Sequence, residues 1–158
     1  MPPSGSPVKE AILDDIEQNA LPLIVAGPDY YTAVEKIQRI EAGPTEVKMF
    51  PAVLIAPLET EYNRDGTHGT LTQRAAFRIQ LSLFLRTRTD AVSKIERFIR
   101  DVHKALMVDR TRNNLAVNTR MISDEVIYPT EDDDPYTIAN MIIEVDYRTD
   151  WDEPNNAT

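Results

Sequence analysis

The sequence lacks cysteine entirely and is poor in glycine, with five glycines among 158 residues. Without cysteine the chain has no disulfide, no thiolate metal ligand and no cysteine nucleophile. Long apolar runs are missing too, since no segment approaches the roughly 18 apolar residues of a transmembrane helix. The opening Met-Pro-Pro-Ser-Gly-Ser-Pro has neither the basic nor the apolar region of a signal peptide. We therefore expect a protein that stays in the cytoplasm where it is made, or in a particle assembled there.

Positive charge is also in deficit. The chain carries 17 Lys and Arg against 26 Asp and Glu, which gives a net charge of −9 with neutral histidines. A protein that coats nucleic acid needs a basic surface, and one that adheres to anionic lipid needs basic clusters. The composition therefore argues against both classes, and it favours one acidic globular domain, since about 100–200 residues is the usual domain size.

The hydrophobic pattern predicts two helices and five strands. The predicted elements are a helix over 8–20, strands over 31–41, 50–58 and 72–86, a helix from 91 to near 109, and strands over 117–128 and 136–147. In the first helix apolar residues recur every four positions from Val8. In the second helix a wide apolar stripe faces the core, and the polar side places Arg97 and Asp101 in water as an i,i+4 ion pair.

The segment Thr72–Arg86 gives the clearest strand. Its apolar residues share one parity: Phe77, Ile79, Leu81, Leu83 and Leu85. At about 3.3 Å per residue the strand spans about 50 Å, whereas a compact domain of this length measures about 40 Å across. We therefore expect its start to project from the body, together with the polar segment Glu59–Leu71, which is predicted to be a long hairpin connection.

Two other strands carry apolar residues on both faces. The segment Phe50–Leu58 is apolar at both parities, which is typical of a strand covered on both sides. In Tyr136–Tyr147 the odd positions from Ala139 form the predicted core face, while Ile138 and Ile142 add apolar surface to the opposite face. This surplus predicts self-association through the side of the sheet away from the core.

Together these elements predict an α+β fold. We expect a mainly antiparallel sheet with two helices packed on one face, in the order α-β-β-β-α-β-β. Residues 1–7 are expected to form a disordered leader, 8–150 a single domain, and 151–158 a polar tail.

Catalytic motifs are missing, and the candidate metal ligands have a simpler interpretation. The sequence has no G-x-S-x-G, no P-loop and no G-x-G-x-x-G. Glu61, Asp65 and His68 could hold a divalent metal, but nothing fixes their spacing, so a solvated polar loop is favoured. The other histidine, His103, is predicted to lie on the surface of the second helix. No cofactor is expected.

Charged runs are interpreted in the same way. The acidic run Glu131, Asp132, Asp133 and Asp134 lies between two prolines and lacks the glycine and distal glutamate of a calcium loop, so a solvated hairpin loop is favoured. Four arginines lie at the same parity along or just after the long strand: Arg74, Arg78, Arg86 and Arg88. We expect them to solvate the strand or to pair with acids of a neighbouring subunit.

The order of elements resembles that of a known family. Its residues include Ala33-Val34-Glu35-Lys36-Ile37-Gln38-Arg39-Ile40, then Phe50-Pro51-Ala52-Val53-Leu54-Ile55 leading into Glu59-Thr60-Glu61, the strand Phe77–Leu85, the helix Ala91–Leu106, and Ile143-Glu144-Val145-Asp146-Tyr147-Arg148. With this length, the chain resembles the tail-terminator, or tail-completion, proteins of long-tailed bacteriophages over about residues 8 to 150. Small head–tail connector and neck proteins have a similar pattern.

The resemblance implies a structural virion protein without enzymatic activity. It implies a ring, usually of six subunits, that caps the head-proximal end of the tail tube, stops its growth and docks the neck, with DNA passing through unbound. Candidate subunit contacts are Phe50, Leu54, Phe84, Ile138 and Ile142. Candidate contacts with the tube or neck are Glu61, Arg64, Asp65 and His68, and Glu131–Asp134 would supply negative charge to the lumen. The alternative from another class is a metal-dependent enzyme that uses the Glu61, Asp65 and His68 loop.

Overall fold

A computed structural model describes residues 7–40, 47–64, 72–87, 89–128 and 135–150. In chain order the elements are α1 (Val8–Asp15), the π-helical turn η1 (Ile16–Ala20), the 3₁₀ turn η2 (Leu21–Leu23), β1 (Lys36–Arg39), β2 (Ala52–Arg64), β3 (Thr72–Arg86), α2 (Ala91–Val108), β4 (Asn118–Ile127) and β5 (Tyr136–Asp150). The predicted α+β class and the predicted order of helices and strands are confirmed.

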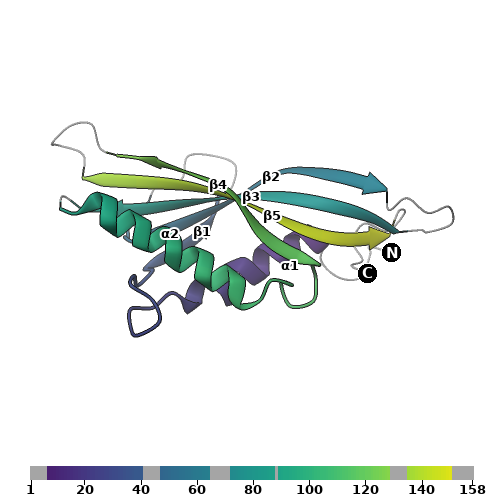
Figure 1. The fold of residues 1–158 in the computed structure, drawn as a ribbon, viewed down its shortest axis with the longest axis horizontal. Helices are drawn as coiled ribbons and strands as arrows, with labels where there is room; N and C mark the ends of the chain where they lie inside the picture. The colour runs from purple at the N-terminus through teal and green to yellow at the C-terminus, as the bar shows by residue number, and fades with distance from the viewer. Residues whose placement is uncertain (1–6, 41–46, 65–71, 88, 129–134, 151–158) are drawn as a thin grey trace.

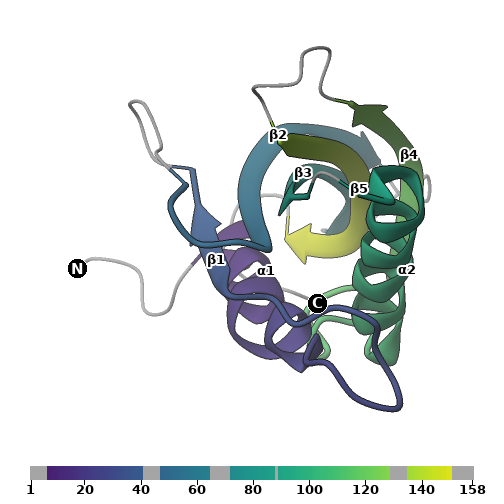
Figure 2. The same cartoon turned by 90° about the vertical axis from the view of Figure 1, so that its left-hand side faces the viewer.

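The five strands form one sheet in the order β1-β2-β3-β5-β4. Strand β3 is antiparallel to both β2 and β5, and β4 is antiparallel to β5, so the sheet is mainly antiparallel. The exception is β1, which runs parallel to β2. Both helices lie on the same side of the sheet, beneath it in Figure 1. Figure 2, which looks along the long axis of the molecule, shows how strongly the sheet twists, with α2 to its right and α1 at its lower left.

The core lies between the two helices and the odd-numbered face of the central strands. Its strand residues are Phe77, Ile79, Leu81, Leu83 and Leu85 on β3 and Ala139, Met141, Ile143, Val145 and Tyr147 on β5. The helices contribute Val8, Ile12, Ile16 and Ala20 from the first segment and Ile95, Phe98, Val102, Ala105 and Leu106 from α2. These are the stripes that periodicity predicts, because the face of each element that is apolar in sequence has only this layer to be buried in.

The sheet is longer than the layer of α2 beside it. Strand β3 has the predicted bounds, and it pairs with β5 as far as Thr72 opposite Asp150, whereas β4 pairs with β5 no further than Asp146. Figure 1 accordingly shows β2, β3 and β5 continuing past β4 and α2. The predicted projection of this end is confirmed.

The connection predicted over Glu59–Leu71 is wrong in its first half. Residues Glu59–Arg64 belong to β2, and the ladder to β3 runs on from Thr60 opposite Phe77 to Arg64 opposite Gln73 after an irregularity near Pro57. Polar residues are tolerated in this strand because β3 supplies the backbone hydrogen bonds that hold it. Residues 65–71 lie outside the described ranges.

The strand predicted over Tyr31–Glu41 is also too long, since β1 covers only Lys36–Arg39. The amides of Tyr31 and Thr32 donate to the carboxylate of Asp101 on α2, at 3.0 and 2.8 Å. Because these donors bind a side chain of the helix, they are not available for a strand ladder. The predicted exposure of Asp101 is therefore wrong, since its side chain is fully buried.

A buried ion pair joins the end of α2 to the first helix. The guanidinium of Arg112 is 1% exposed and lies 3.4 Å from the carboxylate of Asp15. It also donates to the carbonyls of Leu106 and Asp109, which satisfies acceptors at the helix C-terminus. Burial lowers the pKa of Arg112, and the charges of Asp15 and Asp109 act against that shift.

The core contact of α2 yields a stability prediction. Phe98 is fully buried, so Phe98→Ala should lower the free energy of unfolding by about 3–5 kcal/mol through lost burial and a residual cavity. Val92 lies on the same helix and is 61% exposed. Val92→Ala should change the same quantity by less than about 0.5 kcal/mol. Urea denaturation followed by circular dichroism measures both, and equal effects of the two substitutions would contradict the packing described.

Candidate functional site

Within the described residues, both helices lie on one side of the sheet, and no helix covers the opposite, outer face. It is formed by the even-numbered positions of β3 and β5 and by the residues of β2 and β4 paired beside them. The face is divided along its length: one end is apolar, the middle is polar, and the part next to the projecting end is charged.

The apolar end consists of Phe50, Phe84, Ile127, Tyr136 and Ile138, which we call the apolar patch. In the sheet Phe84 lies opposite Ile138, which lies opposite Ile127. The rings of Phe50 and Tyr136 meet with centroids 5.2 Å apart. Since Ile127 is 49% exposed and Tyr136 36% exposed, the patch retains apolar area that a partner could bury.

The structure separates the five predicted contact residues into three groups. Phe50, Phe84 and Ile138 come together in the apolar patch. Leu54 lies opposite Ser82 and is only 5% exposed, so a partner could bury little more of it. Ile142 pairs with Gln80 and Ser123, apart from the patch.

Sequence reasoning missed two members of the patch. Tyr136 has the same parity as Ile138 on a strand whose first residue was predicted, although the strand ends at Asp150 and not at the predicted Tyr147, so parity alone could have found it. Ile127 is brought beside Ile138 by the register between β4 and β5, which contains a bulge between Met121 and Ser123. Its place therefore could not be derived from the sequence.

The charged end is organised around the buried carboxylate of Glu144. Glu144 on β5 is 3% exposed and lies between two arginines of the neighbouring strands. The Nε atoms of Arg78 and Arg120 donate to its two oxygens at 3.1 and 2.9 Å. Arg74 lies 3.5 Å from Asp146 on the same face. Burial acts to raise the pKa of Glu144, but the hydrogen bonds and charges of Arg120 and Arg78 outweigh it and hold that pKa below its ordinary value.

These pairs bear on the expectation for the strand arginines, and the side chains of Arg74 and Arg78 still solvate the strand because they remain 50% and 40% exposed. Arg74 and Arg78 meet acids of their own sheet, so they do not need acids from a neighbouring subunit. Arg86 lies over the ring of Tyr136, with its guanidinium carbon 5.9 Å from the centroid. Arg88 lies outside the described residues.

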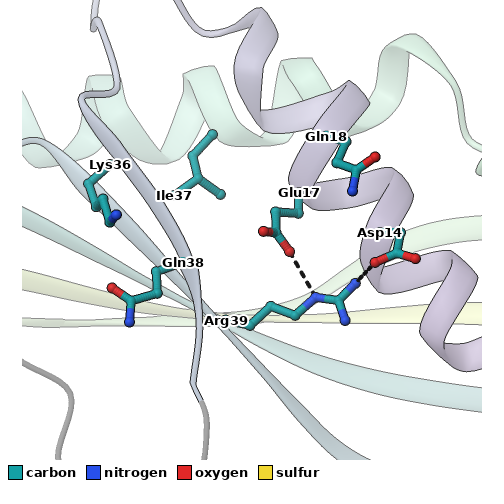
Figure 3. A pocket seen from close by; sticks show the side chains of 7 residues that line it. All are labelled: Asp14, Glu17, Gln18, Lys36, Ile37, Gln38 and Arg39. Carbon is teal, nitrogen blue, oxygen red and sulfur yellow. Dashed lines mark hydrogen bonds and ion pairs between the residues drawn. The ribbon is translucent and has the colours of Figure 1, made fainter.

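A polar groove of about 560 Å³ separates the first helix from the edge strand β1. Figure 3 shows Arg39 reaching across it from β1 to the carboxylates of Asp14 and Glu17. The ion pair with Glu17 measures 2.9 Å. The side chains that line the groove, from Asp14 on the helix to Arg39 on the strand, include no histidine or hydroxyl nucleophile. The groove therefore has the composition of a polar contact between two elements.

The alternative metal ligands are only partly described. Glu61 is an exposed residue of β2, and Arg64 is the last residue of that strand, whereas Asp65 and His68 lie outside the described ranges. The acidic run Glu131–Asp134 lies outside them too. His103 is exposed, as predicted. Over the ranges that the structure describes, no group of three His, Asp or Glu side chains is placed to hold a metal ion, and no helix is both long and apolar enough to cross a membrane.

The similarities of this chain to known proteins lie among solved structures. No protein-family model matches the chain, and no curated protein matches it. A chain from a solved structure described as "Virion of native gene transfer agent (GTA) particle" aligns with a TM-score of 0.44 at 6% identity, covering 90% of this chain and 96% of that one. A similarity at this level establishes neither the fold nor the function of the chain.

The Glu144 network predicts a pH dependence of stability. Glu144→Gln removes a buried anion from between two arginines and should cost about 1.5–3 kcal/mol of unfolding free energy at pH 7. Because the folded-state pKa is depressed, the contribution of the carboxylate is present above about pH 4.5 and disappears as the pH falls through the folded value. The difference in unfolding free energy between wild type and Glu144→Gln, measured by urea unfolding at a series of pH values, should therefore shrink as the pH falls below about 4.5.

A matched substitution separates this effect from general loss of negative charge. Glu125 lies on the exposed part of β4, on the same face of the sheet. Glu125→Gln should change the unfolding free energy by less than about 0.5 kcal/mol. A constant difference between wild type and Glu144→Gln over the whole pH range would contradict the prediction.

Proposed function

We propose that this chain is a structural virion protein of a tailed phage or phage-like particle, and that it acts as a tail terminator. Copies would form a ring, with six subunits as the expected number, that caps the head-proximal end of the tail tube. The ring would stop tube growth, dock the neck or connector protein, and leave a passage for DNA. The resemblance of the element order over residues 8–150 suggests this role, and the apolar patch is the observation that supports self-assembly.

The location of the apolar patch suits a contact between copies. A ring requires heterologous interfaces, in which a surface of one subunit meets a different surface of the next. The apolar patch lies on the one side of the sheet that neither helix covers, and its aromatic and aliphatic residues are of the kind that form interface centres. The charged end of the same face already pairs its own charges, so apolar burial would supply the adhesion.

The projecting end of the sheet suits contact with the tube or neck. Strands β2, β3 and β5 extend there beyond α2 and β4, which leaves this end accessible when the body is packed in a ring. Glu61 and Arg64 lie on β2 at this end. A connector or neck protein would use the same surfaces as a tail terminator. Assembly on the ends of tail tubes distinguishes the tail terminator from the connector or neck protein.

A charge placed within the apolar patch should prevent ring formation. Ile127 is exposed in the single subunit, so Ile127→Asp should leave the fold intact and remove the favourable burial of the patch. Light scattering after size exclusion gives the mass, and negative-stain electron microscopy of the protein mixed with its tail-tube protein shows rings at tube ends. We expect rings for the wild type and at least a tenfold weaker association for Ile127→Asp.

Ser123→Asp is the matched control, because Ser123 is an exposed residue of the same strand, on the same face but outside the apolar patch. It adds the same charge and should leave the rings unchanged. A wild-type protein that stays monomeric at high micromolar concentration and does not bind tube ends would refute the proposed function. Rings that persist in Ile127→Asp would place the interface elsewhere.

A further inference from the structure

One face of α2 carries a row of positive side chains in a chain whose net charge is −9. The row consists of Lys94, Arg97, Arg100 and Lys104, all exposed, and we call it the basic face. Both arginines lie over the ring of Tyr31, with guanidinium carbons 5.3 and 5.2 Å from its centroid. Because Tyr31 is itself 58% exposed, the cations are held against an aromatic ring that solvent can still reach.

The basic face differs from the other cationic sites of the fold. Five arginines elsewhere in the fold form ion pairs with carboxylates of the same subunit: Arg39, Arg74, Arg78, Arg112 and Arg120. Within the described part of the chain, no carboxylate forms an ion pair with any residue of the basic face. Lys94 and Lys104 also donate hydrogen bonds, to Thr87 and Thr89 and to the carbonyl of Asp29 respectively, whereas no described carboxylate neutralises the charges of Arg97 and Arg100.

An open groove of about 470 Å³ adjoins the basic face. Ala33, Pro51 and Leu85 give it apolar surface, Tyr31, Lys94 and Arg97 join it to the basic face, and Glu35 is the one acid in its lining. The backbone at Tyr31 is fixed by the buried carboxylate of Asp101, so this wall is formed before any partner arrives. A matching ligand would combine a large apolar side chain with flanking carboxylates.

The chain itself contains such a segment. Asp150-Trp151-Asp152-Glu153 sets the single tryptophan of the sequence among three carboxylates. We propose that the basic face and the adjoining groove bind this segment from a second copy of the chain. Trp151 would occupy the groove beside Tyr31, and the flanking acids would pair with Arg97 and its neighbours.

The sheet register excludes the segment of the same copy. Asp150 lies opposite Thr72 at one end of β3, whereas the groove residue Leu85 lies opposite Thr137 at the other end. This separation along β3 amounts to about 40 Å. Trp151 directly follows Asp150, and one residue spans less than about 4 Å, so it cannot reach its own groove. The contact is therefore head-to-tail, and it rests on the proposed self-assembly without using the apolar patch.

The single tryptophan makes the contact directly measurable. When the wild-type protein is concentrated, the fluorescence emission maximum of Trp151 should move to shorter wavelength because the indole side chain leaves water. Dilution or added salt should reverse this shift. Arg97→Glu should raise the protein concentration at which half of this emission shift has occurred at least tenfold. Arg110→Glu, an exposed arginine outside the basic face, makes the same change of charge and should leave the curve unchanged. Combining Arg97→Glu with Asp152→Arg should bring the concentration dependence of the emission shift back to that of the wild type.

A peptide of residues 148–158 tests binding separately from ring formation. Labelled peptide is titrated into the full chain carrying Trp151→Ala, and anisotropy should show saturable binding that Arg97→Glu weakens at least tenfold. Absence of peptide binding, or binding that Arg97→Glu does not weaken, would overturn the proposal even if rings form. Preferential binding of a DNA duplex at the basic face, with the peptide unable to compete, would overturn it too. Peptide binding without rings would support this contact while refuting the proposed tail terminator.

Discussion

The alternating burial of β3 is the constraint on which the arrangement of the whole molecule depends. This strand pairs along its length with β2 on one side and β5 on the other, so it sets the register of the sheet. Its odd positions from Ala75 to Leu85 are buried on the side of the helices, and a slip of one residue would exchange core and outer faces along the strand. The even positions are thereby assigned to the outer face, which is how Phe84 joins the apolar patch and Arg78 the charged end.

The outer face combines a charged end, whose groups pair with one another, with an apolar end that is partly exposed to solvent. At the charged end Glu144 is satisfied by Arg78 and Arg120, and this network orders the strands without requiring anything from outside. A carboxylate left alone at that degree of burial would be costly, so the two arginines are part of the fold. At the apolar end, by contrast, Ile127 keeps about half of its surface in water. The two ends therefore separate structural from interactive surface on one sheet.

The sequence predicts what depends on local pattern and misses what depends on distant partners. The bounds of β3 and the buried stripe of α2 follow from periods of two and 3.6 residues. The segment around Tyr31 is predicted to be a strand, yet its conformation is set by Asp101, which lies 70 residues further along the chain. The pairing of Arg78 with Glu144 depends on a strand register that no local signal specifies. The candidate contacts share this limit: parity placed them on a face, and only the register decided which of them meet.

The π-helical turn of the first helix fixes how many residues that helix must contain. Val8, Ile12, Ile16 and Ala20 are all buried at a strict spacing of four, whereas an α-helix overshoots a full circle by about 40° in four residues. The wider turn η1, with about 4.4 residues per turn, falls short by a similar angle and brings the stripe back into phase with the core. Losing one residue within η1 would restore a regular helix but rotate everything after it by about 100°. This part of the chain should therefore accept exchanges of side chain far more readily than deletions.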